Sequence, residues 1–209
     1  MLYRETSDCF KADYLNHQNS QEVFQCAIFP GDEAPERRVV ETIDGGSICN
    51  LTVFSMCAHN GTHVDAPYHF YNEGKTIDQL DLERVVGECF VTFCEGLVTA
   101  AKAKEILNNA KRINEEAAKR ILIGGDAVVT LEAAQVFAQA GIFLIGNESQ
   151  TVGPMEAPAK VHYELLKAEV VLLEGIRLRG IEEGVYWLNA APLNLEQADG
   201  APCRAILIK

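Results

Sequence analysis

Short apolar runs bounded by turn residues recur along the whole chain. Runs of about four to eight residues are typical of buried or half-buried strands. Glycine, proline and aspartate interrupt the pattern most clearly at residues 29–32 and 44–46, which we interpret as turns. The apolar runs predict strands at residues 51–57, 88–94, 120–123, 142–145, 170–173, 185–188 and 204–208.

Helical patterns alternate with the later strands. Residues 99–110 are rich in helix formers, and residues 157–168 are helical by pattern. In the third segment Thr130 can cap a helix that runs to Ala140 and stops at Gly141. Strands dominate the first half and β-α-β alternation the second, which predicts a mixed α/β fold. The length favours one domain over residues 1–209, although two small domains would also fit.

The composition is that of a globular protein with an acidic surface. Hydrophobic residues make up 48% and charged residues 23%, and the formal net charge is −12. Nucleic-acid binding is not expected, because it requires a basic face. A membrane span is not expected either, because no apolar run approaches the roughly 18 residues that such a helix needs.

Cysteine usage indicates a reducing compartment. The seven cysteines are an odd number without a CxxC pair, and the N-terminal residues lack the apolar core of a signal peptide. We therefore expect free thiols in a cytoplasmic protein. His17 lies alone in a polar stretch and is expected to be solvated.

Three of the five histidines fall within eleven positions. His59, His63 and His69 lie in the segment of residues 59–69, with Asp65 among them. Imidazole and carboxylate are the usual ligands of zinc and its neighbours, and three such groups with an open position describe a catalytic metal site. His59, His63 and Asp65 supply that set.

The spacing favours a loop for this segment. Gly61 between the first two histidines and Pro67 after them argue against a helix. His63 and Asp65 would share one face if the chain is locally extended. The alternative is a polar loop whose histidines bind no metal, but three histidines and an aspartate together favour a metal site.

Two residues further along could complete the site. His162 is on the same helical face as Leu165 and Leu166, and therefore points inward. Glu174 ends an apolar run on the strand face of Leu172, where a carboxylate is costly unless it is paired or bound to a metal. Each alone is a structural residue; near a cation, both become candidate ligands.

The sequence of residues 59–69, HNGTHVDAPYH, resembles the HxGTHxDxPxH signature of the Putative cyclase family, whose best-known members are bacterial kynurenine formamidases. Residues 29–32 resemble the family's PGD turn, residues 74–80 its downstream loop, and residues 199–205 its DGxPxR segment. The likeness covers roughly residues 29–208, and the signature is specific.

The resemblance implies a swivelling β/β/α fold, a site for one or two divalent metal ions per chain, and a homodimer or higher homo-oligomer with residues of a neighbouring subunit near the cleft. Zinc is the default for nitrogen and oxygen ligands, and manganese suits a carboxylate-rich site too. It also implies that His69 is the acid–base group. The metal ligands that it implies, with the aspartate able to bridge two ions, are His59, His63, Asp65, His162 and Glu174.

The chain departs from the family in the loops that shape the pocket. Residues 124–126 are Gly-Gly-Asp where formamidases tend to have Arg-Thr after the strand. The family pattern GxDxxS is altered from Gly146 onward, and Gly175 replaces an Asn that commonly follows the metal-binding glutamate. The substrate is therefore an inference from the family alone.

The resulting hypothesis is metal-dependent hydrolysis of a small-molecule amide, with N-formyl-L-kynurenine as the leading substrate and kynurenine and formate as products. A divalent ion lowers the pKa of bound water from 15.7 towards about 7. His69 would accept the water proton and return it to the leaving amine. A serine triad is disfavoured, since no GxSxG motif occurs.

Two alternatives stay open. The first is a hydrolase of the same metal type that acts on a cyclic amide, lactam or imide. The second is a non-catalytic metal-binding or interaction protein on the same fold. The presence of His69 argues against the second, because a structural metal site needs no extra base.

Overall fold

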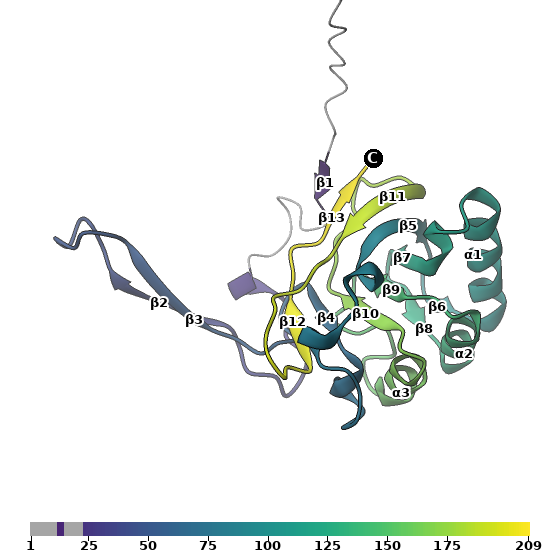
Figure 1. Ribbon diagram of the computed structural model, residues 1–209, viewed down its shortest axis with the longest axis horizontal. Helices are drawn as coiled ribbons and strands as arrows, with labels where there is room; N and C mark the ends of the chain where they lie inside the picture. The colour runs from purple at the N-terminus through teal and green to yellow at the C-terminus, as the bar shows by residue number, and fades with distance from the viewer. Residues whose placement is uncertain (1–11, 15–22) are drawn as a thin grey trace, which may run out of the picture.

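One mixed sheet organises the molecule (Figure 1). The computed structural model describes residues 12–14 and 23–209, so Cys9 and His17 lie outside it. The sheet has nine strands in the order β1-β13-β11-β5-β7-β9-β10-β4-β12. Their bounds are Ala12–Tyr14 (β1), Ile206–Ile208 (β13), Gly184–Asn189 (β11), Val86–Phe93 (β5), Arg120–Gly124 (β7), Leu144–Asn147 (β9), Val171–Glu174 (β10), His63–Asp65 (β4) and Gly200–Pro202 (β12).

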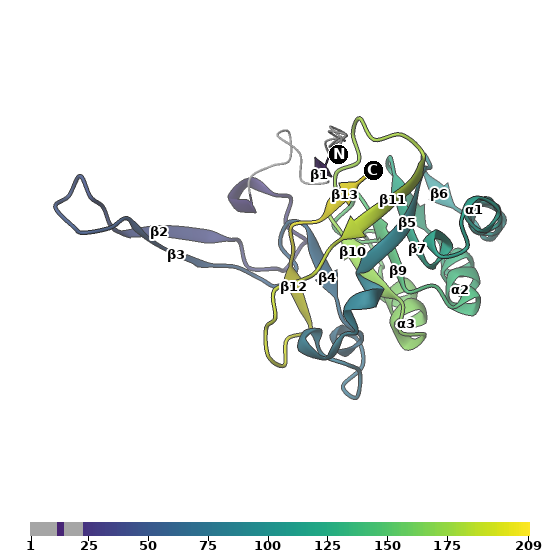
Figure 2. The ribbon, with the colours of Figure 1, turned by 45° about the horizontal axis from the view of Figure 1, so that its top comes forward.

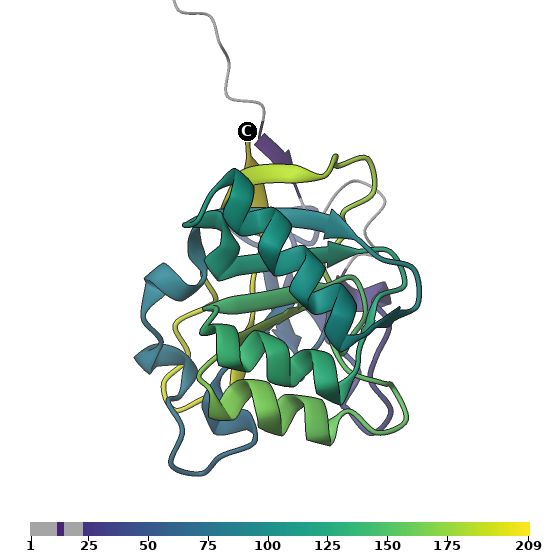
Figure 3. The same ribbon diagram turned by 90° about the vertical axis from the view of Figure 1, so that its right-hand side faces the viewer.

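The centre of the sheet is parallel and the flanks are antiparallel. Strands β5, β7, β9 and β10 run parallel to one another, with helices α1 (Ala100–Ile113), α2 (Leu131–Ala140) and α3 (Ala159–Lys167) in the connections between them. All three helices cover the same face of the sheet (Figure 3). A second, parallel pair of short strands is formed by β6 (Leu97–Val98) and β8 (Val128–Val129). The predicted mixed α/β fold is confirmed.

All three predicted helices are present; α2 has the predicted ends, whereas α1 runs on to Ile113 and α3 begins at Ala159. Thr99 Oγ1 accepts a hydrogen bond from the backbone N–H of Lys102, and Thr130 Oγ1 accepts one from that of Ala133. Gly141 ends α2 with φ 67°, in the left-handed region that favours glycine. No described helix is long and apolar enough to cross a membrane.

The parallel strands are buried on both faces, which explains their continuous apolar sequences. In β7, Ile121 and Ile123 pack towards the helices, in a core with Phe137 and Leu165, while Leu122 packs in the core on the opposite face. Short 3-10 turns connect the remaining segments: Val23–Gln25, Pro67–His69, Ile77–Gln79, Leu82–Arg84 and Ala117–Lys119.

Strand pairing places the histidine segment beside the end of β10. Strand β4 is antiparallel to β10, with His63 opposite Glu174 and Asp65 opposite Leu172. On its other side β4 pairs with β12, where Gly200 is opposite Asp65. Three segments that lie far apart in the sequence therefore meet at this edge.

A β-hairpin projects away from the body of the molecule (Figures 1 and 2). It consists of β2 (Glu36–Glu41) and β3 (Leu51–Ser55), which pair only with each other, and we call residues 36–55 the arm. Every residue of both strands is exposed. The sequence predicts a strand at residues 51–57 and is right in that, but our interpretation that this strand buries its apolar residues is wrong. The apolar residues of a segment can predict that it forms a strand, but they do not show whether another element packs on that strand.

Candidate metal centre

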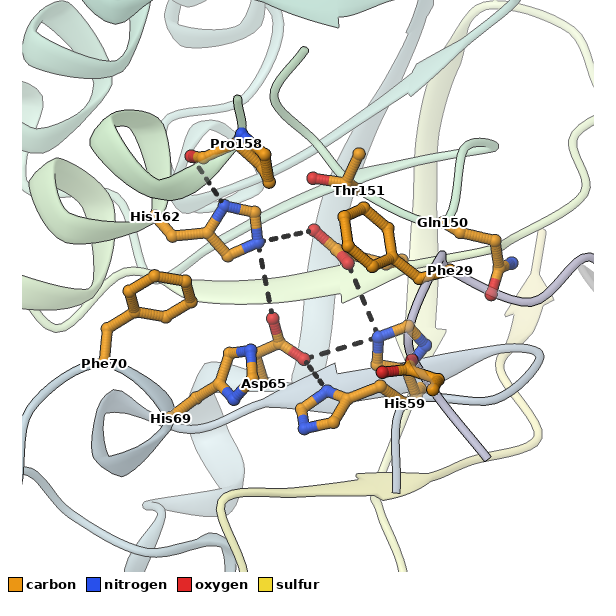
Figure 4. A pocket seen from close by; sticks show the side chains of 12 residues that line it. Phe29, His59, Asp65, His69, Phe70, Gln150, Thr151, Pro158 and His162 are labelled. Carbon is orange, nitrogen blue, oxygen red and sulfur yellow. Dashed lines mark hydrogen bonds and ion pairs between the residues drawn. The ribbon is translucent and has the colours of Figure 1, made fainter. Parts of the chain in front are cut away.

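All six predicted site residues line one pocket, a cavity of about 170 Å³ (Figure 4). They come from β4 and the turns on either side of it, from α3, and from the end of β10. The same pocket is lined by Phe29, Asp32, Phe70, Gln150, Thr151 and Pro158. The cluster lies at the C-terminal end of the parallel strand β10, at the kind of sheet edge where α/β proteins place their ligands.

The loop before β4 bends so that two histidines face one aspartate. Gly61 has φ 71°, which allows the chain to reverse between His59 and His63. His63 Nδ1 lies 3.0 Å from the Gly61 carbonyl oxygen, which leaves Nε2 directed at the carboxylates. Because β4 is extended, His63 and Asp65 point to the same side, as the sequence predicts.

The side-chain donors are spaced as ligands of a metal ion would be. His63 Nε2 is 3.4 Å from Asp65 Oδ1 and 3.4 Å from Glu174 Oε2. His162 Nε2 is 3.3 Å from Glu174 Oε1 and 3.7 Å from Asp65 Oδ2. Two atoms bound at about 2.0–2.1 Å to a tetrahedral zinc ion are separated by about 3.3 Å.

Asp65 carries an unsatisfied atom that fits a cation. The side chain is 1% exposed, and its Oδ2 atom is buried without a hydrogen-bond partner among the described residues. Glu174, 2% exposed, lies beside it. Two buried carboxylates in contact with imidazoles are costly without further compensation. The donor chemistry, the burial and the orphaned oxygen therefore fit a divalent metal ion.

The other two ligand candidates are fixed by backbone contacts. His162 Nδ1 lies 3.1 Å from the Pro158 carbonyl at the start of α3, so its Nε2 faces the cluster. Glu174 Oε1 accepts a hydrogen bond from the Val152 N–H at 2.8 Å. Outer contacts of this kind orient metal ligands. The prediction that His162 points inward is confirmed, and Glu174 is buried at the end of β10.

His69 lies at the rim of the cluster and is held by Asp199. Its Nδ1 is 3.0 Å from Asp199 Oδ2, and the same oxygen is 2.9 Å from His59 Nε2. The rings of His59 and His69 have centroids 4.1 Å apart. His59, Asp65 and His69 form a second group of donors close enough together to share an ion, so the geometry allows His69 to be either a ligand or a free base.

The acid–base state of the cluster is set by its carboxylates. Burial lowers the pKa of His59, but hydrogen bonds to Asp199 and Asp65 outweigh it and raise the pKa to about 11. The pKa values of His63 and His162 are raised in the same way, by Glu174 against burial. Hydrogen bonds from His59 and His69 lower the pKa of Asp199. A metal ion that binds these imidazoles would therefore compete with protons.

Sequence reasoning gave no role to Asp199 or to the polar and aromatic walls of the pocket. Asp199 belongs to the segment that resembles the family's DGxPxR motif, which could have marked it as a candidate site residue. Its contact partner His59 lies 140 positions away in the sequence, so no local pattern predicts the contact. Phe29 and Asp32 stood in the predicted turn at residues 29–32. Only the three-dimensional structure shows that this turn lines the pocket.

A buried set of histidines and carboxylates that lines a cavity of a mixed α/β fold defines a candidate metal-dependent enzyme. The Putative cyclase family model matches residues 14–154. The kynurenine formamidase of Bacillus cereus (strain ATCC 10987 / NRS 248) is 32% identical over 194 residues, which cover 87% of this chain and 90% of that protein. The chain belongs to the Putative cyclase family.

Solved structures share the fold. A potential metal-dependent hydrolase with cyclase activity is 25% identical, covers 88% of this chain and 91% of its own, and superposes with a TM-score of 0.70. Isatin hydrolase A from Labrenzia aggregata is 19% identical, with 88% of each chain covered and a TM-score of 0.72. The chain is thus an enzyme of the hydrolase class, as the sequence predicts.

Proposed function

We propose that the protein is an arylformamidase, which hydrolyses N-formyl-L-kynurenine to kynurenine and formate. The observation that carries the proposal is the arrangement of His69 beside the donor cluster in a pocket of limited size. The likeness to proteins named kynurenine formamidase over most of the chain supports the same substrate. A cavity of about 170 Å³ suits the formamide end of such a molecule, with the remainder extending towards solvent.

The five ligand candidates would hold the metal: His59, His63, Asp65, His162 and Glu174. Bound there, a divalent ion supplies Lewis acidity, which acidifies water and polarises a carbonyl oxygen. We propose zinc, because imidazole nitrogen and carboxylate oxygen at these spacings suit it; manganese is the alternative that the same ligands accept. A shared carboxylate, Asp65, would allow two ions.

His69 would move the protons. Asp199 faces Nδ1 of His69, which fixes the proton on that nitrogen and leaves Nε2 as the base. Nε2 would take the proton of the attacking water and then deliver it to the aniline nitrogen as the C–N bond breaks. The carboxylate stabilises the imidazolium that exists between the two transfers.

The decisive experiment is a hydrolysis assay with zinc-loaded and manganese-loaded protein. N-formyl-L-kynurenine should be turned over, with kynurenine detected by its absorbance and formate by a coupled assay. Isatin and a simple lactam test the cyclic-amide alternative. Turnover of isatin alone would replace the proposed substrate, and a protein that binds zinc but hydrolyses none of the three would support the non-catalytic alternative.

We further infer a reducing compartment, the cytoplasm, and assembly with a second copy of the chain. The six described cysteines are free thiols, which supports the first. For the second, the arm exposes apolar side chains, among them Val53 at 45% and Phe54 at 57%. A lone two-stranded hairpin is marginally stable in water. The arm itself carries three carboxylates and two arginines, so we attribute the association to its apolar side chains and not to charge.

Light scattering of Phe54→Asp tests the assembly. A charge in place of the exposed ring should shift the protein towards monomer, whereas Ile113→Asp, at an equally exposed apolar position on α1, should not. A wild-type protein that is monomeric at micromolar concentration would rule the assembly out.

A further inference from the structure

One wall of the pocket is formed by a turn that contributes no candidate metal ligand. Phe29 and Asp32 both line the cavity and are the first and last residues of one β-turn, in which the Asp32 N–H donates to the Phe29 carbonyl at 3.0 Å. Pro30 suits the second position of a type II turn, and Gly31, with φ 107°, supplies the positive φ that the third position requires. The turn thus presents an aromatic ring and a carboxylate to the same cavity.

The charge of Asp32 is uncompensated within the described part of the chain. Its side chain is half-buried and forms no hydrogen bond or ion pair with a described residue. The other carboxylates of the pocket, Asp65 and Glu174, face histidines and would balance the charge of one divalent ion. Among residues 12–14 and 23–209, no lysine or arginine lines the cavity. A cationic group on a bound molecule would therefore find its counter-ion in Asp32.

Aromatic rings stand on both sides of the cavity. Phe29 lies near Gln150 and Thr151, and Phe70 lies near His69 and His162, with the metal cluster between them (Figure 4). Phe70 packs on His162 with ring centroids 5.0 Å apart, which fixes its orientation. Aromatic faces attract both other aromatic rings and cations.

We propose that the Phe29–Asp32 turn recognises a cationic amino group on an aromatic amide substrate, with Asp32 as the counter-ion. The inference rests on the proposed function, because it places the amide at the metal cluster and the ammonium group at the turn. Asp32 is then a specificity-determining residue: it favours substrates that carry an ammonium group over amine-free analogues of the same shape.

The test compares two substrates in the wild-type protein and three variants. N-formyl-L-kynurenine carries the α-ammonium group, and 4-(2-formamidophenyl)-4-oxobutanoate is the same molecule without it. Asp32→Asn should raise KM for the first substrate about tenfold, the effect of one half-buried ion pair, with kcat nearly unchanged. KM for the second should change less than twofold. Asp32→Glu should restore much of the lost affinity.

Glu33→Gln is the matched control. It removes the same charge from the neighbouring residue, which is exposed and does not line the pocket. It should leave KM for both substrates unchanged. An equal effect of Asp32→Asn on both substrates, or an effect of Glu33→Gln as large as that of Asp32→Asn, would overturn the inference while the proposed function stood.

A binding measurement separates the two hypotheses. The probe is trimethyl(3-phenylpropyl)ammonium, an aromatic cation that cannot ligate a metal ion, and calorimetry measures its Kd in the zinc-loaded protein. Weaker binding in Asp32→Asn but not in Glu33→Gln supports the inference even if no formamide is hydrolysed. Binding that is absent or independent of Asp32 contradicts it.

Discussion

Asp65 serves two sides of the cluster with one carboxylate. Oδ1 faces His59 at 2.8 Å and His63 at 3.4 Å, while Oδ2 faces His162 at 3.7 Å. Hydrogen bonds from His59 and the charges around it lower its pKa despite complete burial. No other described side chain of the cluster contacts all three imidazoles, so the ligand set depends on this residue most.

Asp65→Asn should abolish tight metal binding. The amide keeps the shape of the side chain but removes the negative charge, and we expect zinc affinity to fall at least about 100-fold, more than the loss of an outer contact causes. Competition with a chromophoric chelator measures it. Asp78→Asn, at an exposed carboxylate outside the pocket, is the control. Unchanged zinc affinity in Asp65→Asn would remove this residue from the site.

His69→Ala separates the two roles that the geometry allows. If His69 is the acid–base group, kcat should fall about 100-fold or more while zinc content stays the same. Asp199→Asn should also lower kcat, and because Asp199 contacts His59 as well, it should weaken zinc binding about tenfold. Zinc content is measured by atomic emission. Loss of zinc in His69→Ala would make His69 a ligand instead.

At the scale of elements, the junction between the histidine loop and the end of β10 depends on Gly175. Thr62 Oγ1 donates to the Gly175 carbonyl at 2.8 Å, and the Gly175 N–H donates to the Ser149 carbonyl at 2.7 Å. A Cβ atom at Gly175 would collide with the Gly61 carbonyl oxygen and lie 2.5 Å from Gln150 Nε2. A larger residue here, such as the Asn common in the family, would therefore require the two loops to move apart.

Gly175→Ala should destabilise the protein more than Gly141→Ala. Both glycines have nearly the same φ, 68° and 67°, but a Cβ at Gly141 meets open space. We expect the free energy of unfolding to fall by about 1 kcal/mol in Gly141→Ala, from backbone strain alone. In Gly175→Ala it should fall by about 2–4 kcal/mol, because overpacking adds to the strain. Urea unfolding measures both. An equal loss of unfolding free energy in both variants would contradict this expectation, because it would mean that the two loops can move apart without destabilising the protein.

The elements that could be predicted from sequence are those whose signal is local. Thr130 and Gly141 mark helix ends by their own side-chain or backbone chemistry, and the structure has them there. The histidine segment was found because its ligands are close in sequence. Asp199 lies at the site because β12 pairs with β4, and Asp32 because the chain before the arm passes beside the pocket. No local sequence pattern predicts either contact.

At the scale of the whole molecule, metal binding should stabilise the folded protein, and its affinity should depend on pH. In the metal-free protein the pKa values of His59, His63 and His162 are raised, whereas metal ligation requires neutral imidazole. Zinc must therefore displace protons at pH 7. The affinity should fall as the pH is lowered, since protons compete for the same nitrogens.

Calorimetric titration with zinc in two buffers of different ionisation enthalpy should give different heats, from which the number of released protons follows. We also expect zinc to raise Tm and a chelator to reverse the rise, because the ion binds the folded state. Identical heats in both buffers would show that the histidines are already neutral in the metal-free protein.

The arm has a consequence for biosynthesis. Residues 36–55 are synthesised before β4 and all later strands and helices of the body, which take further time to be translated at about 5–20 residues per second. During that time a strand pair with exposed apolar side chains has no finished body beside it, and such edges template aggregation. Glu36, Arg37, Arg38 and Glu41 interrupt its apolar positions with charges of both signs. We expect these residues to protect the nascent chain, so their neutralisation should lower the soluble yield before it alters the folded enzyme.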